Sequence, residues 1–418
     1  MSIHDVVIVG AGASGLMAAS FAATTGAQVV LLEKMPQAGK KLSISGKGRG
    51  NLTNTAAVAE FIGHFGANGN FLRQAFARFF RHELLALLAE EGVATVAERG
   101  GRIFAASGRA QEVTAALRHR AVRLGVKLVE NCRVQAIHHD GQLFTVVAEV
   151  GIIATKTLIL ATGGASYPRT GSTGDGYRLA AALGHGLMPI RPALVPLVTA
   201  PAPDKKMVGL CLRNIGLAVR IQGKKTVSDF GELVFTSDGL SGPLILEWSG
   251  AIVEALAVGR AVHLAIDLKP ALSDEQLTAR LRRDGEARAT EPLSSVLRGL
   301  MAKEMVPSCL GDTGLAATRA AARLGPSDWQ KIHHWLKLRE YAVTGHRPLA
   351  EALVTAGGVS LKEVNPYTME SRLVPGLYFA GEILDLQADT GGYNLQAAFS
   401  TGTLAGTSAG NRAKSDAG

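Results

Sequence analysis

Short apolar runs and helical stretches alternate along the first part of the chain. Apolar residues fill positions 6–9 and 29–32, and a stretch of helical composition, 16–23, lies between them. Apolar runs of this length bounded by turn residues predict buried strands, here up to position 9 and over 28–32. Positions 6–32 carry no charge, but glycine, threonine and glutamine interrupt them. We therefore interpret the segment as a strand–helix–strand unit rather than as a membrane span.

The alternation continues over the next 150 residues. Apolar positions at helical spacing predict one amphipathic helix over 71–91, whose phenylalanines belong to the core. A second helix over 109–124 leads to a strand at 127–130 and an extended segment at 134–138, interpreted as another crossover onto the same sheet. A strand at 157–160 and a helix ending at 183 follow.

The pattern changes near position 191. Prolines cluster there, short strands are expected at 217–221 and 232–235, and two S-x-x-Q capping boxes, at 273–276 and 327–330, predict helix starts. Strands followed by helices, without alternation, predict an inserted α+β domain over 191–345, in the place of a substrate or cap domain. Alternation resumes at 352–359. The remaining domain is therefore discontinuous, with residues 1–190 and 346–418.

A glycine motif follows the first strand. Gly10, Gly12 and Gly15 form G-x-G-x-x-G, with Ala13 and Ser14 inside it. The first glycine allows a tight turn, the second a close approach of backbone to a pyrophosphate, and the third close packing of the helix on the strand. The pyrophosphate then lies at the helix N-terminus, where backbone N–H groups lack partners. Glu33 ends the next strand, where a carboxylate binds the hydroxyls of an unphosphorylated ribose.

A second segment near the C-terminus predicts which dinucleotide binds. A strand at 376–380 ends in Gly381-Glu382, and Gly391-Gly392 opens the last helix. Such a helix would direct its N-terminus at flavin N1 and O2, where reduced flavin carries negative charge. The two segments together predict FAD in a Rossmann-type domain with a parallel sheet, of overall class α/β. The predicted cofactor-binding residues are Gly10, Gly12, Ala13, Ser14, Gly15, Glu33, Lys34, Lys40, Lys41, Ser45, Gly46, Gly48, Asn51, Thr53, Val134, Ala161, Thr162, Gly163, Gly164, Asp175, Gly381, Glu382, Asn394, Leu395, Gln396 and Ala397.

Composition narrows the class of protein. The chain has 418 residues, 47% of them hydrophobic, and a net charge of +9. Its three cysteines are widely spaced, so neither a disulfide framework, a zinc site nor a redox dithiol is expected, and no metal. The cations are dispersed, and the run Arg280, Arg282 and Arg283 includes nearby acids, so we interpret it as a solvated helix face. No signal-peptide pattern is visible, which predicts a cytoplasmic protein with no membrane partner.

The motifs resemble those of the BaiN-like family of bacterial FAD-dependent, NAD(P)-linked oxidoreductases. The similarity spans nearly the whole chain and includes GKKLSISGKGRGNLTN at 39–54, ATGGASYPRTGSTGDGY at 161–177, FTSDGLSGPLIL at 235–246 and GLYFAGEILDLQADTGGYNLQAAFSTG at 376–402. The resemblance implies an FAD domain built from both chain ends, with an inserted domain that covers the flavin. Family members commonly have Cys where this chain has Gly50.

These observations predict an FAD-dependent enzyme that transfers hydride between a nicotinamide cofactor and a small organic substrate, which the family name suggests is enone-like. No second glycine motif follows a strand, so NAD(P)H is expected to dock transiently. Nucleic acid is not an expected partner. A flavin-dependent RNA-modifying enzyme and a non-catalytic FAD redox sensor stay open as alternatives. No catalytic residue is assigned, and the polar groups to test first are Tyr167, Arg169, His346, Arg347 and Tyr393.

Overall fold

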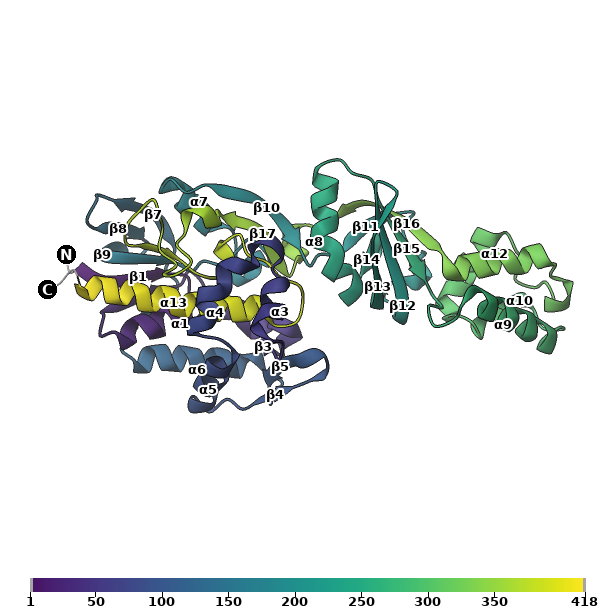
Figure 1. Cartoon of the computed structure of the whole chain (residues 1–418), viewed down its shortest axis with the longest axis horizontal. Helices are drawn as coiled ribbons and strands as arrows, with labels where there is room; N and C mark the ends of the chain where they lie inside the picture. The colour runs from purple at the N-terminus through teal and green to yellow at the C-terminus, as the bar shows by residue number, and fades with distance from the viewer. Residues whose placement is uncertain (1–2, 416–418) are drawn as a thin grey trace. The chain divides into compact units, whose positions relative to one another are not determined.

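The structure, a computed structural model, describes residues 3–415 (Figure 1). The chain forms two compact units. The first extends to Ala193 and resumes at Leu349, and the second comprises Leu194–Pro348. The boundaries expected from the sequence, at 190/191 and 345/346, lie within a few residues of these positions. Within residues 3–415, no helix combines the length and the apolar character needed to cross a bilayer.

The first unit is built on a seven-stranded mixed sheet. Five strands run parallel in the order β6-β2-β1-β9-β18, so that Val7 of β1 lies between Val30 of β2 and Leu158 of β9. The long strand β9 pairs antiparallel with β8 through its first half, and β7 pairs with β8. The strands are β1 (Ile3–Val9), β2 (Val29–Leu32), β6 (Lys127–Val129), β7 (Val134–His139), β8 (Phe144–Ala148), β9 (Gly151–Leu160) and β18 (Leu377–Phe379). The parallel Rossmann-type sheet predicted from the alternation is confirmed.

Helices α1 (Ala13–Thr24) and α13 (Tyr393–Ser415) pack against each other along their lengths (Figure 1). Three glycines of α13 lie directly on the backbone of α1. A Cβ added to Gly402 would lie 2.3 Å from Ser14 O, one added to Gly406 would lie 2.2 Å from Ala18 O, and one added to Gly410 would lie 3.0 Å from Ala22 O. Only glycine permits so close an approach of two backbones. Both series advance by four residues in the same direction, so the two helices are parallel and their N-termini point the same way.

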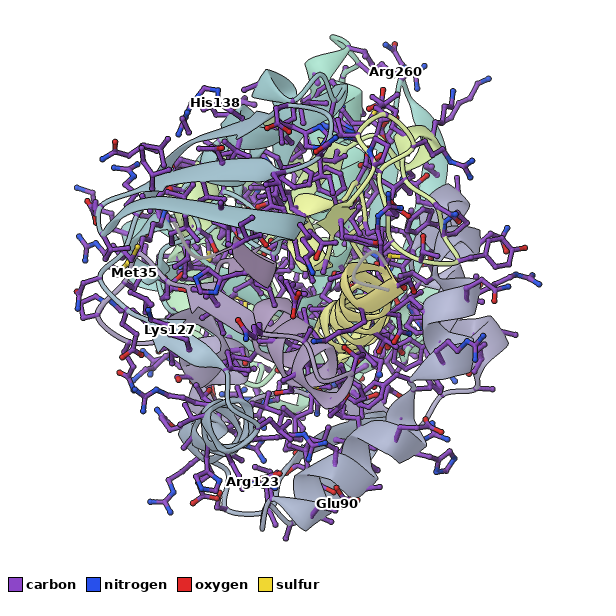
Figure 2. The ribbon with its side chains drawn as sticks, turned by 90° about the vertical axis from the view of Figure 1, so that its left-hand side faces the viewer. Met35, Glu90, Arg123, Lys127, His138 and Arg260 are labelled. Atoms are coloured by element: carbon purple, nitrogen blue, oxygen red, sulfur yellow. The ribbon has the colours of Figure 1, made fainter. Side chains whose placement is uncertain are left out.

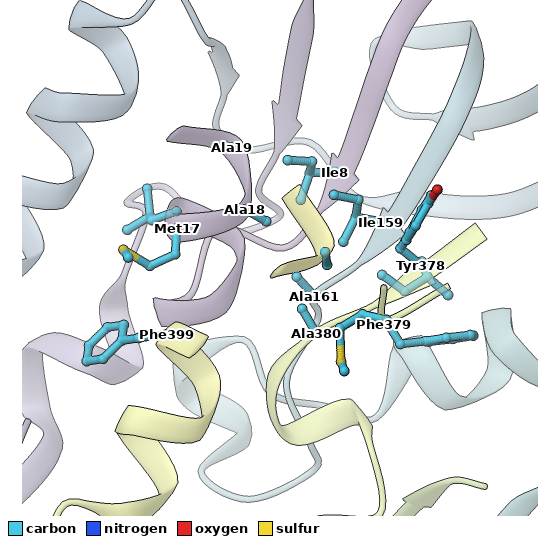
Figure 3. Close-up of a cluster of buried hydrophobic side chains, with 14 of the residues drawn as sticks. Ile8, Met17, Ala18, Ala19, Ile159, Ala161, Tyr378, Phe379, Ala380 and Phe399 are labelled. Carbon is cyan, nitrogen blue, oxygen red and sulfur yellow. The ribbon is translucent and has the colours of Figure 1, made fainter. Parts of the chain in front are cut away.

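The core of this unit lies between the sheet and these two helices. Figure 3 shows Met17 and Ala18 of α1 together with Ile8 of β1, Ile159 of β9 and Phe379 of β18. All five side chains are fully buried. The central parallel strands are apolar where they are buried, at 6–9 in β1, 29–32 in β2 and 158–160 in β9, as expected for a covered parallel sheet.

Smaller elements complete the first unit. A three-stranded sheet of order β3-β5-β4 and an antiparallel pair of β10 with β17 stand beside the main sheet. These elements are β3 (Thr53–Asn54), β4 (Thr95–Ala97), β5 (Arg102–Ala105), β10 (Leu187–Ala193), β17 (Val354–Val359), α2 (Lys40–Ile44), α3 (Val58–Gly63), α4 (Arg73–Arg78), α5 (Arg81–Glu90), α6 (Ala110–Arg123) and α7 (Asp175–Ala182), with short 3₁₀ turns between them.

The single helix predicted over 71–91 is wrong. Helix α4 ends at Arg78, and Phe79 and Phe80 are extended before α5 begins. Both phenylalanines are almost fully buried in this conformation. Glu83 then accepts a hydrogen bond from the backbone N–H of Phe80 and caps the new helix at 2.9 Å. Burial of two adjacent aromatic rings therefore outweighs the helical periodicity.

The second unit combines a closed barrel with a group of helices. The strand order around the barrel is β11-β14-β13-β12-β15-β16. The expected strands at 217–221 and 232–235 are parts of one long hairpin, β12 with β13. The elements are β11 (Leu197–Ala200), β12 (Cys211–Ile221), β13 (Lys224–Phe235), β14 (Gly239–Ser241), β15 (Val262–Asp267), β16 (Arg339–His346), α8 (Pro243–Ala257), α9 (Asp274–Ala287), α10 (Leu293–Arg298), α11 (Val306–Thr313) and α12 (Pro326–Lys337).

One of the two predicted capping boxes is present. Ser273 Oγ accepts from Gln276 N, and Gln276 Oε1 accepts from Ser273 N, at the start of α9. The box predicted at 327–330 is wrong, because α12 starts two residues earlier than a Ser327 cap requires. There Asp328 accepts from the N–H of Gly325, and Pro326 occupies the first helical turn.

We predict that Gly406→Ala destabilises the protein by about 1–3 kcal/mol, because the new methyl group would force two backbones apart. The matched control is Gly311→Ala in α11, where an added Cβ meets nothing within 4 Å. Alanine there should be neutral or stabilising by up to about 1 kcal/mol. Urea unfolding of both variants measures the difference. Equal stability of the two variants would show that the contact of α1 with α13 is not tight.

Candidate functional site

The glycine turn joins β1 to α1, and each of its three glycines has different surroundings. Gly10 has a φ of +98°, and an added Cβ would lie 2.6 Å from Ala161 O. At Gly15 the Cβ would lie 1.8 Å from Gly10 O. The packing of the protein itself therefore requires both residues to be glycine. At Gly12 an added Cβ meets nothing within 4 Å. The open space at Gly12 fits a ligand that approaches the start of α1, which is the role predicted for this glycine.

Residues that follow two other strands, β9 and β18, surround this turn. Ala161 follows β9, and its N–H donates to Val9 O at 2.9 Å. Thr162 lies against both Gly10 and Gly176. A Cβ added to Gly176 would lie 1.9 Å from the Oγ1 atom of Thr162. Gly381, after β18, has a φ of +78°, and its Cβ would lie 2.4 Å from Ser14 Oγ. The two glycine segments at opposite ends of the chain are therefore in contact, with Ala13 and Ser14 in the first turn of α1.

Glu33 ends β2 beside the glycine turn. One carboxylate oxygen accepts from Ala11 N at 2.8 Å, and the other accepts from Met35 N at 2.9 Å. Burial raises the pKa of Glu33, and these two N–H groups, with Lys34, offset part of that effect. The carboxylate thus fixes the turn. Each oxygen keeps a second lone pair, so ribose hydroxyls would be further donors to the same group.

The loop after β2 contacts the segment that leads to β7. Met35 O accepts from Asn131 N at 3.1 Å, and Glu33 O accepts from Cys132 N at 2.8 Å. Figure 2 labels Met35, and also Lys127, where β6 begins and runs on towards Asn131. Val134, two residues beyond Cys132, is buried at the start of β7. Its predicted contact with adenine stays a prediction.

Asp175, at the start of α7, binds two cations from this region. Lys34 Nζ lies 2.9 Å from its carboxylate, and Arg133 lies 3.1 Å away. Burial opposes ionisation of Asp175, but these cations outweigh it and lower its pKa. The structure therefore brings Lys34 and Asp175 together, as partners of each other.

Glu382 connects four segments of the first unit. Its carboxylate lies 2.7 Å from Lys41 Nζ and 3.2 Å from Ser166 Oγ, and it accepts from Thr355 N at 2.8 Å. Lys41 Nζ also donates to Ser166 Oγ at 2.8 Å. Burial opposes ionisation of Glu382, but Lys41 and these hydrogen bonds outweigh it, so the pKa of Glu382 is lowered. The sequence predicted Lys41 and Glu382 as cofactor ligands, and in the structure they form an ion pair.

Two glycines pass close to this ion pair. An added Cβ at Gly164 would lie 2.3 Å from Thr355 Oγ1, and one at Gly163 would lie 3.9 Å from the Glu382 carboxylate. Gly163 also has a φ of +70°. Gly164 is therefore required by the close approach of Thr355 and Glu382, and Gly163 by its backbone conformation. Ser166 and Thr355, which complete the network, were not predicted, because nothing near them in the sequence marks them as polar partners of Glu382.

The loop over 39–54 is only partly directed into this site. Lys40 is exposed on α2, and Ser45 Oγ donates to Leu42 O at 2.7 Å. Gly46, Gly48 and Gly50 have positive φ values. At Gly50, an added Cβ would lie 3.0 Å from Ala110 Cβ. The family's Cys at this position would thus have to adopt a strained conformation in this chain.

Asn51 and Thr53 lie deeper, near the start of α13. Within residues 3–415, four buried side-chain oxygens of this region have no hydrogen-bond partner: Asn51 Oδ1, Thr53 Oγ1, Gln387 Oε1 and Gln396 Oε1. An added Cβ at Gly392 would lie 2.5 Å from Thr53 O, and Asn54 donates to Gly391 O at 3.0 Å. Since buried polar atoms are normally paired, this group fits the polar edge of a ligand.

The helix α13 begins well beyond the start of α1. The register of their contact places Ala13 level with Thr401, and Tyr393 lies eight residues earlier. At 1.5 Å per residue the two N-termini are about 12 Å apart along a common direction. Two positive helix ends with this offset fit the pyrophosphate and the flavin of FAD, which a five-carbon ribityl chain separates. Asn394, Leu395, Gln396 and Ala397 form the first turn of α13. The residues present therefore fit FAD.

The polar candidates for catalysis fall in different places. Tyr167 has a φ of +52° and Arg169 lies in the 3₁₀ turn that follows. Tyr393 is buried at the start of α13. His346 and Arg347 belong to the second unit, where Arg347 pairs with Asp238 at 2.8 Å. Of the three candidates in the first unit, Tyr393 is the first residue of α13.

We predict that Lys41→Met destabilises the protein by about 1–3 kcal/mol at neutral pH, because the largely buried Glu382 carboxylate loses its cation. The lowered pKa of Glu382 provides stability at neutral pH that is lost as the pH falls through the folded-state value. Without Lys41 that pKa rises, so acid unfolding should begin at a higher pH. Urea unfolding between about pH 4 and pH 7 measures this.

The control for this change is Lys40→Met, the exposed neighbour, which should leave the pH profile unchanged. In a Glu382→Gln background, Lys41→Met should lower the free energy of unfolding by less than it does in the parent protein, because the Glu382 charge that pairs with Lys41 is absent. If Lys41→Met destabilises the Glu382→Gln protein as much as the parent protein, the assigned ion pair would be contradicted.

Comparison with known proteins adds to this geometry. A 3-dehydro-bile acid delta(4,6)-reductase of Clostridium scindens is 33% identical over 413 residues, which cover 98% of this chain and 100% of the reductase. Ribosomal RNA dihydrouridine synthases of Haemophilus influenzae and Escherichia coli are 31% and 30% identical, covering 94% and 96% of this chain and 96% of each synthase.

Solved structures share the fold at low identity. The 3-ketosteroid delta1-dehydrogenase of Sterolibacterium denitrificans superposes with a TM-score of 0.52 at 14% identity, covering 99% of this chain and 100% of that one. The quinol fumarate reductase FrdA of E. coli also gives a TM-score of 0.52, at 17% identity, covering 99% of this chain and 71% of that one. The model of the family described as the HI0933-like protein Rossmann domain matches residues 4–408. These findings confirm the family predicted from the motifs, and the chain belongs to the HI0933-like Rossmann family.

Proposed function

We propose that this protein is an FAD-dependent oxidoreductase that reduces a carbon–carbon double bond activated by a neighbouring carbonyl. The observation that carries the proposal is the pair of parallel helices α1 and α13, whose N-termini are offset by about 12 Å with open space at Gly12. Buried unpartnered oxygens at Asn51, Thr53 and Gln396 stand at the second helix end. This is the arrangement expected for a flavin whose pyrophosphate lies on α1.

The acceptor class follows from the chemistry that the names of the relatives share. A delta(4,6)-reductase of a 3-dehydro bile acid adds hydrogen to double bonds conjugated with a ketone. A dihydrouridine synthase adds hydrogen to the double bond of uracil, which is also conjugated with a carbonyl. Both acceptors are electron-poor at the carbon that receives hydride. A site built for one such acceptor suits the same reaction on another.

The residues of this chain have distinct parts in the proposal. The N–H groups at the start of α1 would bind the pyrophosphate, and Glu33 the adenosine ribose. The N–H groups and side chains at the start of α13 would bind the polar edge of the flavin. Bound FAD would supply the hydride equivalent that the acceptor gains. Lys41 and Glu382 hold the segments around the site in place.

The electron donor is proposed to be NADH or NADPH, and the protein to act in the cytoplasm. The chain has one glycine motif that follows a strand, so the nicotinamide dinucleotide would bind transiently rather than in a domain of its own. A bound flavin that neither dinucleotide reduces would instead favour a substrate dehydrogenase, an oxidase or the redox sensor considered from the sequence.

Uridine in ribosomal RNA is the second candidate acceptor. Two relatives of nearly full length are ribosomal RNA dihydrouridine synthases. The second unit also carries exposed cations that could contact phosphates, on the β12–β13 hairpin and the turn before it: Lys205, Lys206, Arg213, Lys224 and Lys225. Binding through such contacts would weaken steeply with salt. If the protein does not bind ribosomal RNA even at low salt, this candidate is excluded.

We predict that Gly12→Ala and Gly15→Ala separate cofactor binding from stability. Gly12→Ala should leave unfolding of the apoprotein unchanged, since an added Cβ there meets nothing within 4 Å, yet weaken FAD binding at least about tenfold. Gly15→Ala should destabilise the apoprotein itself, because its Cβ would lie 1.8 Å from Gly10 O. Fluorescence titration with FAD and thermal unfolding measure the two effects. Unaltered FAD affinity in Gly12→Ala would place the cofactor elsewhere.

The reaction is tested by anaerobic stopped-flow absorbance. NADH or NADPH should bleach the oxidised flavin band, and a 3-oxo-Δ4,6 steroid should restore it with formation of the reduced steroid. Ribosomal RNA lacking dihydrouridine serves as the alternative acceptor in a parallel reaction. Saturated 3-oxo steroid is the matched control, because it lacks the double bond. Failure of both unsaturated acceptors to reoxidise the flavin would overturn the proposed acceptor class.

A further inference from the structure

A histidine and an aspartate form a pair at the start of α13 that the proposed reaction does not use. His64 Nδ1 lies 2.9 Å from Asp389 Oδ2, and the two side chains are 26% and 37% exposed. The imidazole also stacks on Tyr393, with ring centroids 3.8 Å apart and an angle of 20° between the planes. Phe61 packs against the same tyrosine ring, with centroids 4.7 Å apart. His64 therefore contacts both the loop before α13 and its first residue.

Further contacts fix this loop to the region that carries His64. Asn68 donates to the backbone oxygen of Asp385 at 2.8 Å and lies 3.0 Å from its carboxylate. At the other end of the loop, Asn54 donates to Gly391 O at 3.0 Å. Asn394 closes the loop on itself, because it donates to Ala388 O at 2.8 Å and accepts from Ala388 N at 2.9 Å. The distance between Asp389 and the first turn of α13 is thus set by the fold.

The charged group in direct contact with His64 is Asp389. Asp385 is bound to Asn68 on the segment that follows His64, and Arg81 of α5 donates to Asn54 O at 3.0 Å, on the segment that holds Gly391. Tyr393 covers its ring from α13, and Glu60 lies one turn earlier on α3 and is exposed. Protonation of His64 would neutralise Asp389. With His64 neutral, the Asp389 carboxylate stands uncompensated next to the positive end of α13.

We propose that His64 is a positioning residue whose charge balances Asp389 at the start of α13 and thereby sets the reduction potential of FAD bound there. The inference rests on the proposed binding of FAD with its polar edge at this helix end. Reduced flavin carries negative charge at N1, so an uncompensated carboxylate nearby makes reduction less favourable. A protonated His64 cancels that effect. The potential of the bound flavin would therefore fall further with rising pH than the flavin alone requires.

Two substitutions test the two partners separately. His64→Gln keeps a hydrogen-bond donor for Asp389 but cannot be protonated, and Asp389→Asn keeps the acceptor without its charge. Potentiometric titration of the FAD-loaded proteins at about pH 6 and about pH 9 brackets the usual range of histidine titration. His82→Gln, on the exposed face of α5, is the matched control.

The expected shifts have opposite signs at the two pH values. At about pH 6, His64→Gln should have a lower potential than the parent protein, and Asp389→Asn, which keeps a protonatable His64 without the balancing carboxylate, should not fall below the parent. At about pH 9, His64→Gln should match the parent, and Asp389→Asn should have a higher potential. His82→Gln should match the parent throughout. A purely structural role of His64 would not move the potential of His64→Gln with this dependence on pH.

The outcomes separate this inference from the proposed function. A parent protein that binds no FAD would overturn the proposed function. A protein that binds FAD, and whose two variants both match its potential at both pH values, would overturn the role of His64 alone. If His64→Gln does not retain FAD, the test depends on Asp389→Asn alone. A potential of Asp389→Asn that equals that of the parent at about pH 9 would overturn the role of the pair.

Discussion

The close contact between the backbones of α1 and α13 is the constraint on which the rest of the first unit depends. It brings the two ends of the chain together, because Gly402, Gly406 and Gly410 lie directly on the backbone of the N-terminal helix. A side chain larger than hydrogen at these positions would separate the helices. Their parallel register also places two positive helix ends on one side of the sheet, about 12 Å apart. The geometry that suits a dinucleotide with a flavin is thus a consequence of backbone packing.

A second set of interactions holds the loops around those helix ends. Glu382 follows β18 and ties the loop of Lys41 to the segment of Ser166 and to Thr355 in β17. Glu33 fixes the glycine turn in a similar way, through Ala11 and Met35. Both carboxylates are largely buried, and each accepts at least one backbone N–H. Buried charge is tolerated because the donors are supplied by the fold itself.

The sequence predicted the glycine positions well because each has a local physical reason. Gly10 needs a positive φ and Gly15 a close approach, and both requirements arise within a few residues of the motif. The pairing of Lys41 with Glu382 joins residues 341 positions apart, so no local pattern contains it. The helix predicted across Phe79 and Phe80 failed for a related reason, since burial of both rings depends on the surrounding core. Barrel closure in the second unit likewise depends on strand register, which periodicity leaves open.

The position of α13 in the chain bears on how the protein is made. The face of α1 that carries Ser14, Ala18 and Ala22 is covered by α13, which is synthesised more than 300 residues later in the chain. At typical bacterial rates, roughly 20–80 s of synthesis separate the two helices. During that time α1 lacks its partner helix, and the second positive helix end of the proposed cofactor site is missing. A nascent chain that stops before α13 therefore has only the half of the site that is built on α1.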